Sequence, residues 1–178
     1  MRRDGMAITI GPAAEDDLGP LRDFHVSNHL DETCHCPGER EHQIGDLKDD
    51  FPQLYSAEVF RRGSFRVATA EPGGKILGCV GLVPDEEEPD EVTWLNTFSV
   101  SREVRGRGVG SELLRWALGA VETGRVRLVT LGGHSEGKDV MGVARSMYEK
   151  SGFALYKKST VKYGDSTTID VLYYEKIM

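Results

Sequence analysis

Residues 94–121, WLNTFSVSREVRGRGVGSELLRWALGAV, form the stretch that decides the fold. Its first part, Trp94–Val100, is rich in β-branched and aromatic side chains and holds no glycine or proline, which is typical of a strand. Its last part, Ser111–Val121, repeats apolar side chains every three or four positions, which predicts one apolar helix face. The predicted order is therefore a strand, a glycine-rich turn and a helix.

The glycine-rich turn, Arg105–Gly110, has glycine at every second position. Glycine adopts positive φ without steric cost, so successive N–H groups of such a turn can point into one space. The following helix N-terminus adds unpaired N–H donors and partial positive charge, and Arg105 and Arg107 add full charges. The turn is therefore expected to bind an anion such as a pyrophosphate. It is no Walker A loop, because no Gly-Lys-Ser/Thr follows, and no GxGxxG pattern, because Ser111 replaces the third glycine.

Length and composition predict one globular domain over residues 1–178, with 39% apolar and 29% charged residues. No apolar run reaches eighteen residues and no signal-peptide core is recognised, so a cytoplasmic protein without membrane contact is expected. The net charge of −7 disfavours nucleic-acid binding through Arg102, Arg105 and Arg107. The odd number of cysteines, three, gives no disulfide framework.

A polar segment, residues 27–43, is interpreted as a loop, although it contains residue types that bind zinc: Cys34, His35, Cys36 and His42. A structural zinc site needs four ligands, commonly as two separated pairs. A C-x-C spacing with nearby histidines matches this pattern poorly, so no metal site is predicted.

The remaining chain alternates between strand-like and helical patterns. Strands are predicted at 7–10, 64–70, 75–83, 94–100, 125–131, 153–163 and 167–177, and helices at 18–25, 44–62, 111–121 and 139–150. Pro52 interrupts the second helical pattern, and the acidic residues 85–91 are interpreted as a solvated turn. The strand–helix–strand unit around the glycine turn predicts a parallel pair, whose ligands bind at the carboxyl ends. The other connections favour antiparallel pairing, so the fold predicted is α/β (α+β), with a mixed, mostly antiparallel sheet of about seven strands.

Two segments resemble the GCN5-related N-acetyltransferase (GNAT) family. Arg105-x-x-Gly108-x-Gly110 is similar to the family's R/Q-x-x-G-x-G/A signature, and Ala144–Phe153, ARSMYEKSGF, is similar to its A-x-x-x-Y-E-K-x-G-F segment. The resemblance covers about residues 94–153 and implies acetyl-CoA as the co-substrate. It implies that the parallel strand pair forms the acetyl-CoA cleft. The cofactor-binding residues that it implies are Phe98, Ser99, Val100, Arg105, Gly106, Arg107, Gly108, Val109, Gly110 and Ser111.

The same resemblance implies a general acid at Tyr148, which would protonate the thiolate of coenzyme A as it leaves; packing of this side chain on the sheet is the alternative. Many relatives carry an asparagine where this chain has Met141, and a glutamate in the strand before the glycine turn, where this chain has no carboxylate. The candidate bases are therefore Glu91, acting through water, and His134, whose ordinary pKa suits the role. An oxyanion donor is expected from the N–H of Val100 or its neighbour.

The leading hypothesis is an acyltransferase that moves an acetyl group from acetyl-CoA to a primary amine of a small molecule, protein or peptide, by direct attack in a ternary complex. The alternative is a non-catalytic acyl-CoA sensor on the same fold, motivated by Met141 and by the missing strand glutamate. A homodimer is a further possibility that the resemblance raises. The sequence does not identify the acceptor.

Overall fold

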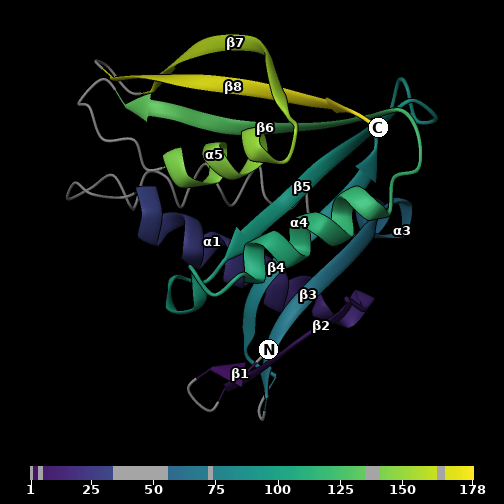
Figure 1. The fold of residues 1–178 in the computed structure, drawn as a ribbon, viewed down its shortest axis with the longest axis vertical. Coiled ribbons are helices and arrows are strands. Elements are labelled where there is room, and N and C mark those ends of the chain that lie inside the picture. Colours follow the sequence, from purple (N-terminus) through teal and green to yellow (C-terminus); the bar gives the residue numbers. More distant parts are fainter. Residues whose placement is uncertain (1, 4–5, 34–55, 72–73, 135–140, 164–166) are drawn as a thin grey trace. The chain divides into compact units, whose positions relative to one another are not determined.

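The computed structural model describes residues 2–3, 6–33, 56–71, 74–134, 141–163 and 167–178 (Figure 1). The chain forms two compact units. Unit 1 comprises residues 1–84 and 95–120, and unit 2 comprises residues 85–94 and 121–178. The boundary falls within strand β5 (Val92–Val100), so this strand contributes to both units.

Unit 1 contains the strands in the order β1, β2, β3, β4 and β5. Their bounds are β1 (Arg2–Arg3), β2 (Met6–Pro12), β3 (Ser64–Glu71) and β4 (Ile76–Pro84). The pairs β1/β2, β2/β3 and β3/β4 are antiparallel, and β3 and β4 change register between Ala68 and Thr69. The neighbouring order β3, β4, β5 confirms that the strands predicted at 64–70, 75–83 and 94–100, before the glycine turn, lie side by side.

The helices of unit 1 are α1 (Leu18–Thr33), α3 (Ala57–Arg62) and α4 (Val109–Gly119), with short 3-10 helices η1 (Glu15–Asp17) and η2 (Arg102–Val104). The α4 helix buries Val109, Leu113, Leu114 and Ala117, and the last three belong to the apolar face predicted over 111–121. Gly78 lets it lie close to β4, because a Cβ there would come within 3.1 Å of both Leu113 Cδ1 and the Ser99 carbonyl oxygen. Burial of that face fixes the helix on the sheet.

Unit 2 contains the first residues of β5 followed by β6 (Arg125–His134), β8 (Thr167–Ile177) and β7 (Ala154–Tyr163), in that order. The β5/β6 pair is parallel and joins Val92–Trp94 to Arg125–Arg127, as predicted. The β6/β8 and β7/β8 pairs are antiparallel. Helix α5 (Gly142–Lys150) lies beside these strands (Figure 1). Together, the strands of both units confirm a mixed, mostly antiparallel sheet with flanking helices.

The acidic residues before β5 form an ordered turn. Both the Glu87 and Glu88 N–H groups donate to Asp85 Oδ1, at 2.8 and 2.9 Å, and Trp94 Nε1 donates to Asp85 Oδ2 at 2.6 Å. The Trp94 hydrogen bond, followed by those from the backbone, lowers the pKa of Asp85. The predicted turn is thus stabilised by one of its own carboxylates.

Two sequence interpretations need correction. Residues 27–33, interpreted as loop because they are polar, continue α1 to Thr33. The helix predicted to reach Val121 ends at Gly119. The candidate metal ligands Cys34, His35, Cys36 and His42, and most of the helix predicted over 44–62, lie outside the described residues. None of the helices in the described part of the chain is long and apolar enough to cross a membrane.

Candidate active site

The glycine turn leaves its backbone open to solvent. Gly106 and Gly108 have φ of 73° and 87° and are exposed, and a Cβ on Gly106 would meet nothing within 4 Å. Gly108 is the N-cap of α4 and supplies no side-chain cap. The first helical hydrogen bond runs from the Glu112 N–H to the Gly108 carbonyl at 3.0 Å, so the N–H groups of residues 109–111 have no acceptor within the helix. This donor set fits an anionic phosphate.

Arg105 holds the turn against the end of β5. Its Nε and Nη2 atoms both donate to the Val100 carbonyl oxygen, each at 3.0 Å. Burial lowers the pKa of Arg105, and a guanidinium stays charged at neutral pH despite such a shift. Arg105 therefore fixes the turn to the end of β5 and keeps its positive charge beside the N-terminus of α4.

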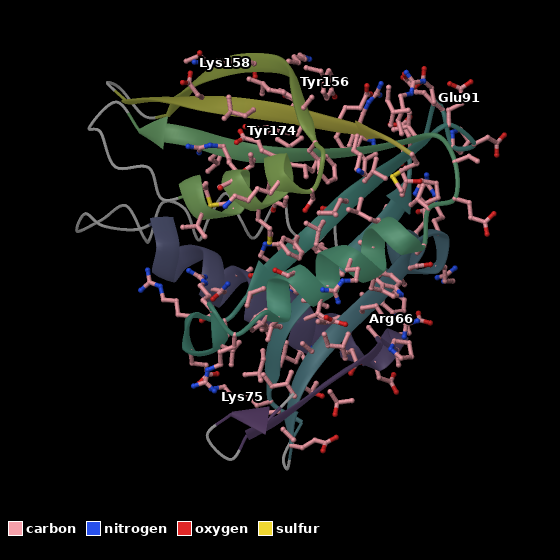
Figure 2. All side chains as sticks on the ribbon, in the orientation of Figure 1. Arg66, Lys75, Glu91, Tyr156, Lys158 and Tyr174 are labelled. Atoms are coloured by element: carbon pink, nitrogen blue, oxygen red, sulfur yellow. The ribbon has the colours of Figure 1, made fainter. Side chains whose placement is uncertain are left out.

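The acid nearest the turn is already paired. Glu103 lies 2.7 Å from Lys75 Nζ and accepts a hydrogen bond from Ser101 Oγ at 3.3 Å. The hydrogen bond from Lys75 is the main reason that the pKa of Glu103 is lowered. Figure 2 shows Lys75 just before β4. Pairing of Glu103 reduces its repulsion of an anion bound at the turn.

A buried asparagine from α1 reaches the same strand end. Asn28 is 9% exposed, and its Nδ2 donates to Ser99 Oγ at 2.6 Å and to the Val100 carbonyl oxygen at 3.2 Å. Sequence reasoning missed this residue because it lay in the interpreted loop. The available signal was its spacing, since Asn28 continues the helical face that contains Leu21 and Phe24.

Thr97 is the strained residue of β5. Its φ is 51°, which is unfavourable for a β-branched side chain. The side chain is 4% exposed, and its hydroxyl has no hydrogen-bond partner in the described structure. The Thr97 N–H donates to Asn96 Oδ1 at 2.8 Å, and the Cys79 thiol donates to the Thr97 carbonyl oxygen at 3.0 Å. These contacts hold the backbone in this conformation just before Phe98–Val100.

Tyr148 is buried in unit 2. It is 5% exposed, and its ring meets that of Phe153 edge to face, with centroids 6.0 Å apart. Burial raises the pKa of the phenol well above its ordinary value, so Tyr148 keeps its proton at neutral pH. The group can donate a hydrogen bond, and it also packs its helix.

The rest of the second family segment forms the end of α5. Gly152 has φ of 90°, the Gly152 N–H donates to the Glu149 carbonyl at 3.0 Å, and the Phe153 N–H donates to the Tyr148 carbonyl at 3.1 Å. This is a glycine cap followed by an apolar contact back onto the helix. Tyr174 extends from β8 toward α5 (Figure 2), and its hydroxyl donates to Glu149 Oε1 at 3.0 Å.

The two candidate bases both belong to unit 2. Glu91 directly precedes β5, is exposed (Figure 2) and pairs with Arg125 Nη2 at 2.7 Å. His134 is the last residue of β6 and lies opposite Ile169 of β8. Both residues stay predictions as bases.

Comparison with known proteins gives the family. Residues 61–155 match the sequence profile described as "Acetyltransferase (GNAT) domain". No curated protein sequence matches the chain.

Solved structures share the fold at low sequence identity. A GNAT-family acetyltransferase from Streptococcus pneumoniae is 19% identical with a TM-score of 0.64, and the alignment covers 97% of this chain and 100% of that one. The ribosomal-protein-S18-alanine N-acetyltransferase of Escherichia coli is 15% identical with a TM-score of 0.60, covering 96% and 94%. The PaiA N-acetyltransferase of Thermoplasma acidophilum, solved in complex with coenzyme A, is 18% identical with a TM-score of 0.63, covering 97% and 99%.

The profile match includes β3, β4, the glycine turn, α4 and the whole of α5, which is more than half of the chain. It therefore contains both segments that carried the resemblance in the sequence. The protein belongs to the GNAT acetyltransferase family, with acetyl-CoA as its co-substrate.

Proposed function

We propose that the protein is an N-acetyltransferase that transfers the acetyl group of acetyl-CoA to a primary amine of a small molecule, protein or peptide. The observation that carries this proposal is the open, uncapped helix N-terminus behind the glycine turn, flanked by Arg105 and Arg107. Such a site fits the pyrophosphate of acetyl-CoA. A turn that served only packing would not need open backbone N–H groups.

The proposal assigns different parts of the co-substrate to neighbouring segments of unit 1. Backbone N–H groups of residues 106–111 bind the pyrophosphate. Residues Phe98–Val100 bind the acyl end, because they end the strand that leads into the turn. Arg105 supports both segments through its two hydrogen bonds to the Val100 carbonyl.

Transfer needs no covalent enzyme intermediate. The neutral amine attacks the thioester carbonyl, the new C–N bond forms, and the C–S bond then breaks to release the thiolate. The Val100 N–H stabilises the oxyanion of the tetrahedral intermediate, a contribution of about 3 kcal/mol for one such donor. The proton lost by the amine leaves through a base, and the thiolate gains one from an acid.

Tyr148 takes the role of general acid in this proposal. Its buried phenol is fully protonated at neutral pH, because burial raises its pKa. A proton donor whose pKa exceeds that of a thiol transfers its proton uphill, at about 1.4 kcal/mol per unit of difference. Tyr148 therefore acts first as a hydrogen-bond donor to the developing thiolate and gives up its proton as the negative charge becomes complete.

The base is assigned to Glu91 acting through water or to His134. Glu91, which pairs with Arg125, would take the proton through a water molecule. Histidine is the side chain most often used as a general base, which favours His134. Substitution of each residue separately distinguishes them, because loss of the true base removes the acidic limb of the rate profile against pH.

An acetyl-CoA titration followed by an amine screen tests the whole proposal. Calorimetry is expected to show binding of acetyl-CoA, and a panel of small amines and peptide N-termini is expected to contain acceptors that release free thiol. Absence of both binding and thermal stabilisation by acetyl-CoA would contradict it.

The alternative is a non-catalytic acyl-CoA sensor on the same fold. Two observations favour it: β5 contains no carboxylate, and Met141 stands at the N-cap of α5 where many relatives have asparagine. Binding of acetyl-CoA without thiol release for any amine would support the sensor. Turnover with a single acceptor would exclude it.

A further inference from the structure

We propose that Asn28 is a positioning residue for acetyl transfer: its side-chain amide fixes the carboxyl end of β5, the segment assigned to the acyl end of acetyl-CoA. The inference rests on the proposed function. It adds a residue from α1, a helix outside both segments that resemble the family.

Asn28 uses both hydrogens of its amide on the same strand. One bond goes to Ser99 Oγ at 2.6 Å and the other to the Val100 carbonyl oxygen at 3.2 Å. A carbonyl oxygen can only accept, so the amide nitrogen must face it. The group is buried, and loss of the amide would leave buried polar atoms of β5 without this donor.

The peptide group between Val100 and Ser101 is held on both sides. Its carbonyl oxygen accepts from Asn28 Nδ2 and from Arg105 Nε and Nη2. Its N–H, that of Ser101, donates to the Leu77 carbonyl on β4 at 2.8 Å. A peptide group bonded at both its oxygen and its nitrogen cannot rotate without breaking several hydrogen bonds.

This arrangement separates two functions within unit 1. Arg105 belongs to the phosphate-binding turn and fixes the Val100 carbonyl from that side. Asn28 fixes the same carbonyl, and the Ser99 hydroxyl, from α1. Removal of Asn28 therefore loosens the strand end but leaves the hydrogen bonds between Arg105 and Val100 in place. We expect weaker binding of the acyl end of the co-substrate and unchanged binding of its nucleotide half.

The experiment compares two ligands on one variant. Asn28→Leu keeps the number and branching of the side-chain heavy atoms and removes the donors. Calorimetry is expected to show acetyl-CoA binding about tenfold more weakly, as the loss of well-placed hydrogen bonds implies, with binding of the nucleotide half, 3′-phospho-ADP, within about twofold of wild type. Ser27→Ala, on the exposed neighbouring residue of α1, is the matched control and leaves both affinities unchanged.

Ser99→Ala provides a second, milder variant, since it removes one of the two acceptors of Asn28. It is expected to weaken acetyl-CoA binding by about threefold. Equal weakening of both ligands in Asn28→Leu would show a merely structural role and overturn the inference, and so would unchanged affinity for acetyl-CoA. A wild-type protein that binds neither ligand would instead overturn the proposed function, and this inference with it.

Discussion

The glycine turn of unit 1 and the end of helix α5 in unit 2 both carry the family resemblance, yet the structure uses them in opposite ways. The turn leaves backbone N–H groups without a side-chain cap, around exposed glycines. The end of α5 satisfies its backbone internally, with Gly152 and Phe153 bonded back onto the last turn. The turn leaves backbone donors open, and the end of α5 bonds its own backbone groups. The proposed chemical role of the second segment rests on Tyr148 alone.

The largest expected effect comes from placing a bulky side chain in the glycine turn. Gly110→Leu places a side chain at the start of α4 and is expected to weaken acetyl-CoA binding by about 100-fold, through loss of charge-assisted hydrogen bonds. Gly119→Leu, at the other end of the helix where a Cβ meets nothing within 4 Å, should bind normally in the same calorimetric titration. Equal affinity of the two variants would contradict a phosphate site at the turn.

The second test asks whether α5 contributes chemistry at all. Tyr148→Phe is expected to lower kcat by about 10- to 100-fold, because it removes the acid, and to leave acetyl-CoA affinity nearly unchanged. Initial rates of thiol release measure this effect. Tyr174→Phe is the matched control, since it also removes a phenol hydroxyl, the one bonded to Glu149, and should keep its kcat. An unchanged kcat with a lowered melting temperature in Tyr148→Phe would assign Tyr148 to packing alone.

The third test concerns the closed backbone of α5. Gly152→Ala forces a residue with a Cβ into φ of 90° and is expected to lower the free energy of unfolding by about 1–2 kcal/mol, without changing acetyl-CoA affinity. Gly19→Ala, within α1 and with open space around its Cβ, should instead stabilise by about 0.5–1 kcal/mol. Chemical denaturation measures both. A large loss of affinity in Gly152→Ala would show that the closed segment also binds the co-substrate.

The smallest expected effect is the pH dependence of Tyr148. Burial raises the pKa of the folded phenol above 10, so the unfolded chain releases this proton first as pH rises. Stability from this group is complete below about pH 9 and decreases above it, by about 0.4 kcal/mol at pH 10. Unfolding of Tyr148→Phe should show a correspondingly weaker alkaline slope. Identical slopes in the two proteins would contradict the burial of the phenol.

Local patterns predicted the parts of the molecule that local physics determines. Glycine spacing located the turn at Arg105–Gly110, and apolar periodicity located α4 and α5. The role of Asn28 could not be predicted, because the polar composition around it favours a loop. Its hydrogen bond to Ser99 joins residues 71 positions apart. The positive φ of Thr97 could not be predicted either. A β-branched residue in a strand pattern predicts an ordinary strand φ, and only tertiary contacts impose the observed 51°.

The role of Arg105 could be predicted only in part. Its charge beside the turn follows from the sequence, but its double hydrogen bond to Val100 depends on how the chain folds back. The single-domain organisation, the cytoplasmic location and the possible homodimer stay predictions. Acceptor choice depends on the shape of a pocket, which residue patterns do not encode directly.

Thr97 implies a trade between stability and activity. A residue with positive φ and a buried, unpaired hydroxyl costs of order 1–3 kcal/mol, and glycine would remove both penalties. Selection of variants for heat resistance alone should therefore favour Thr97→Gly early. Selection for acetyl transfer should retain threonine if the strain aligns the residues that follow it. The two selections together would therefore compare the stability lost through the strain with the activity gained from it.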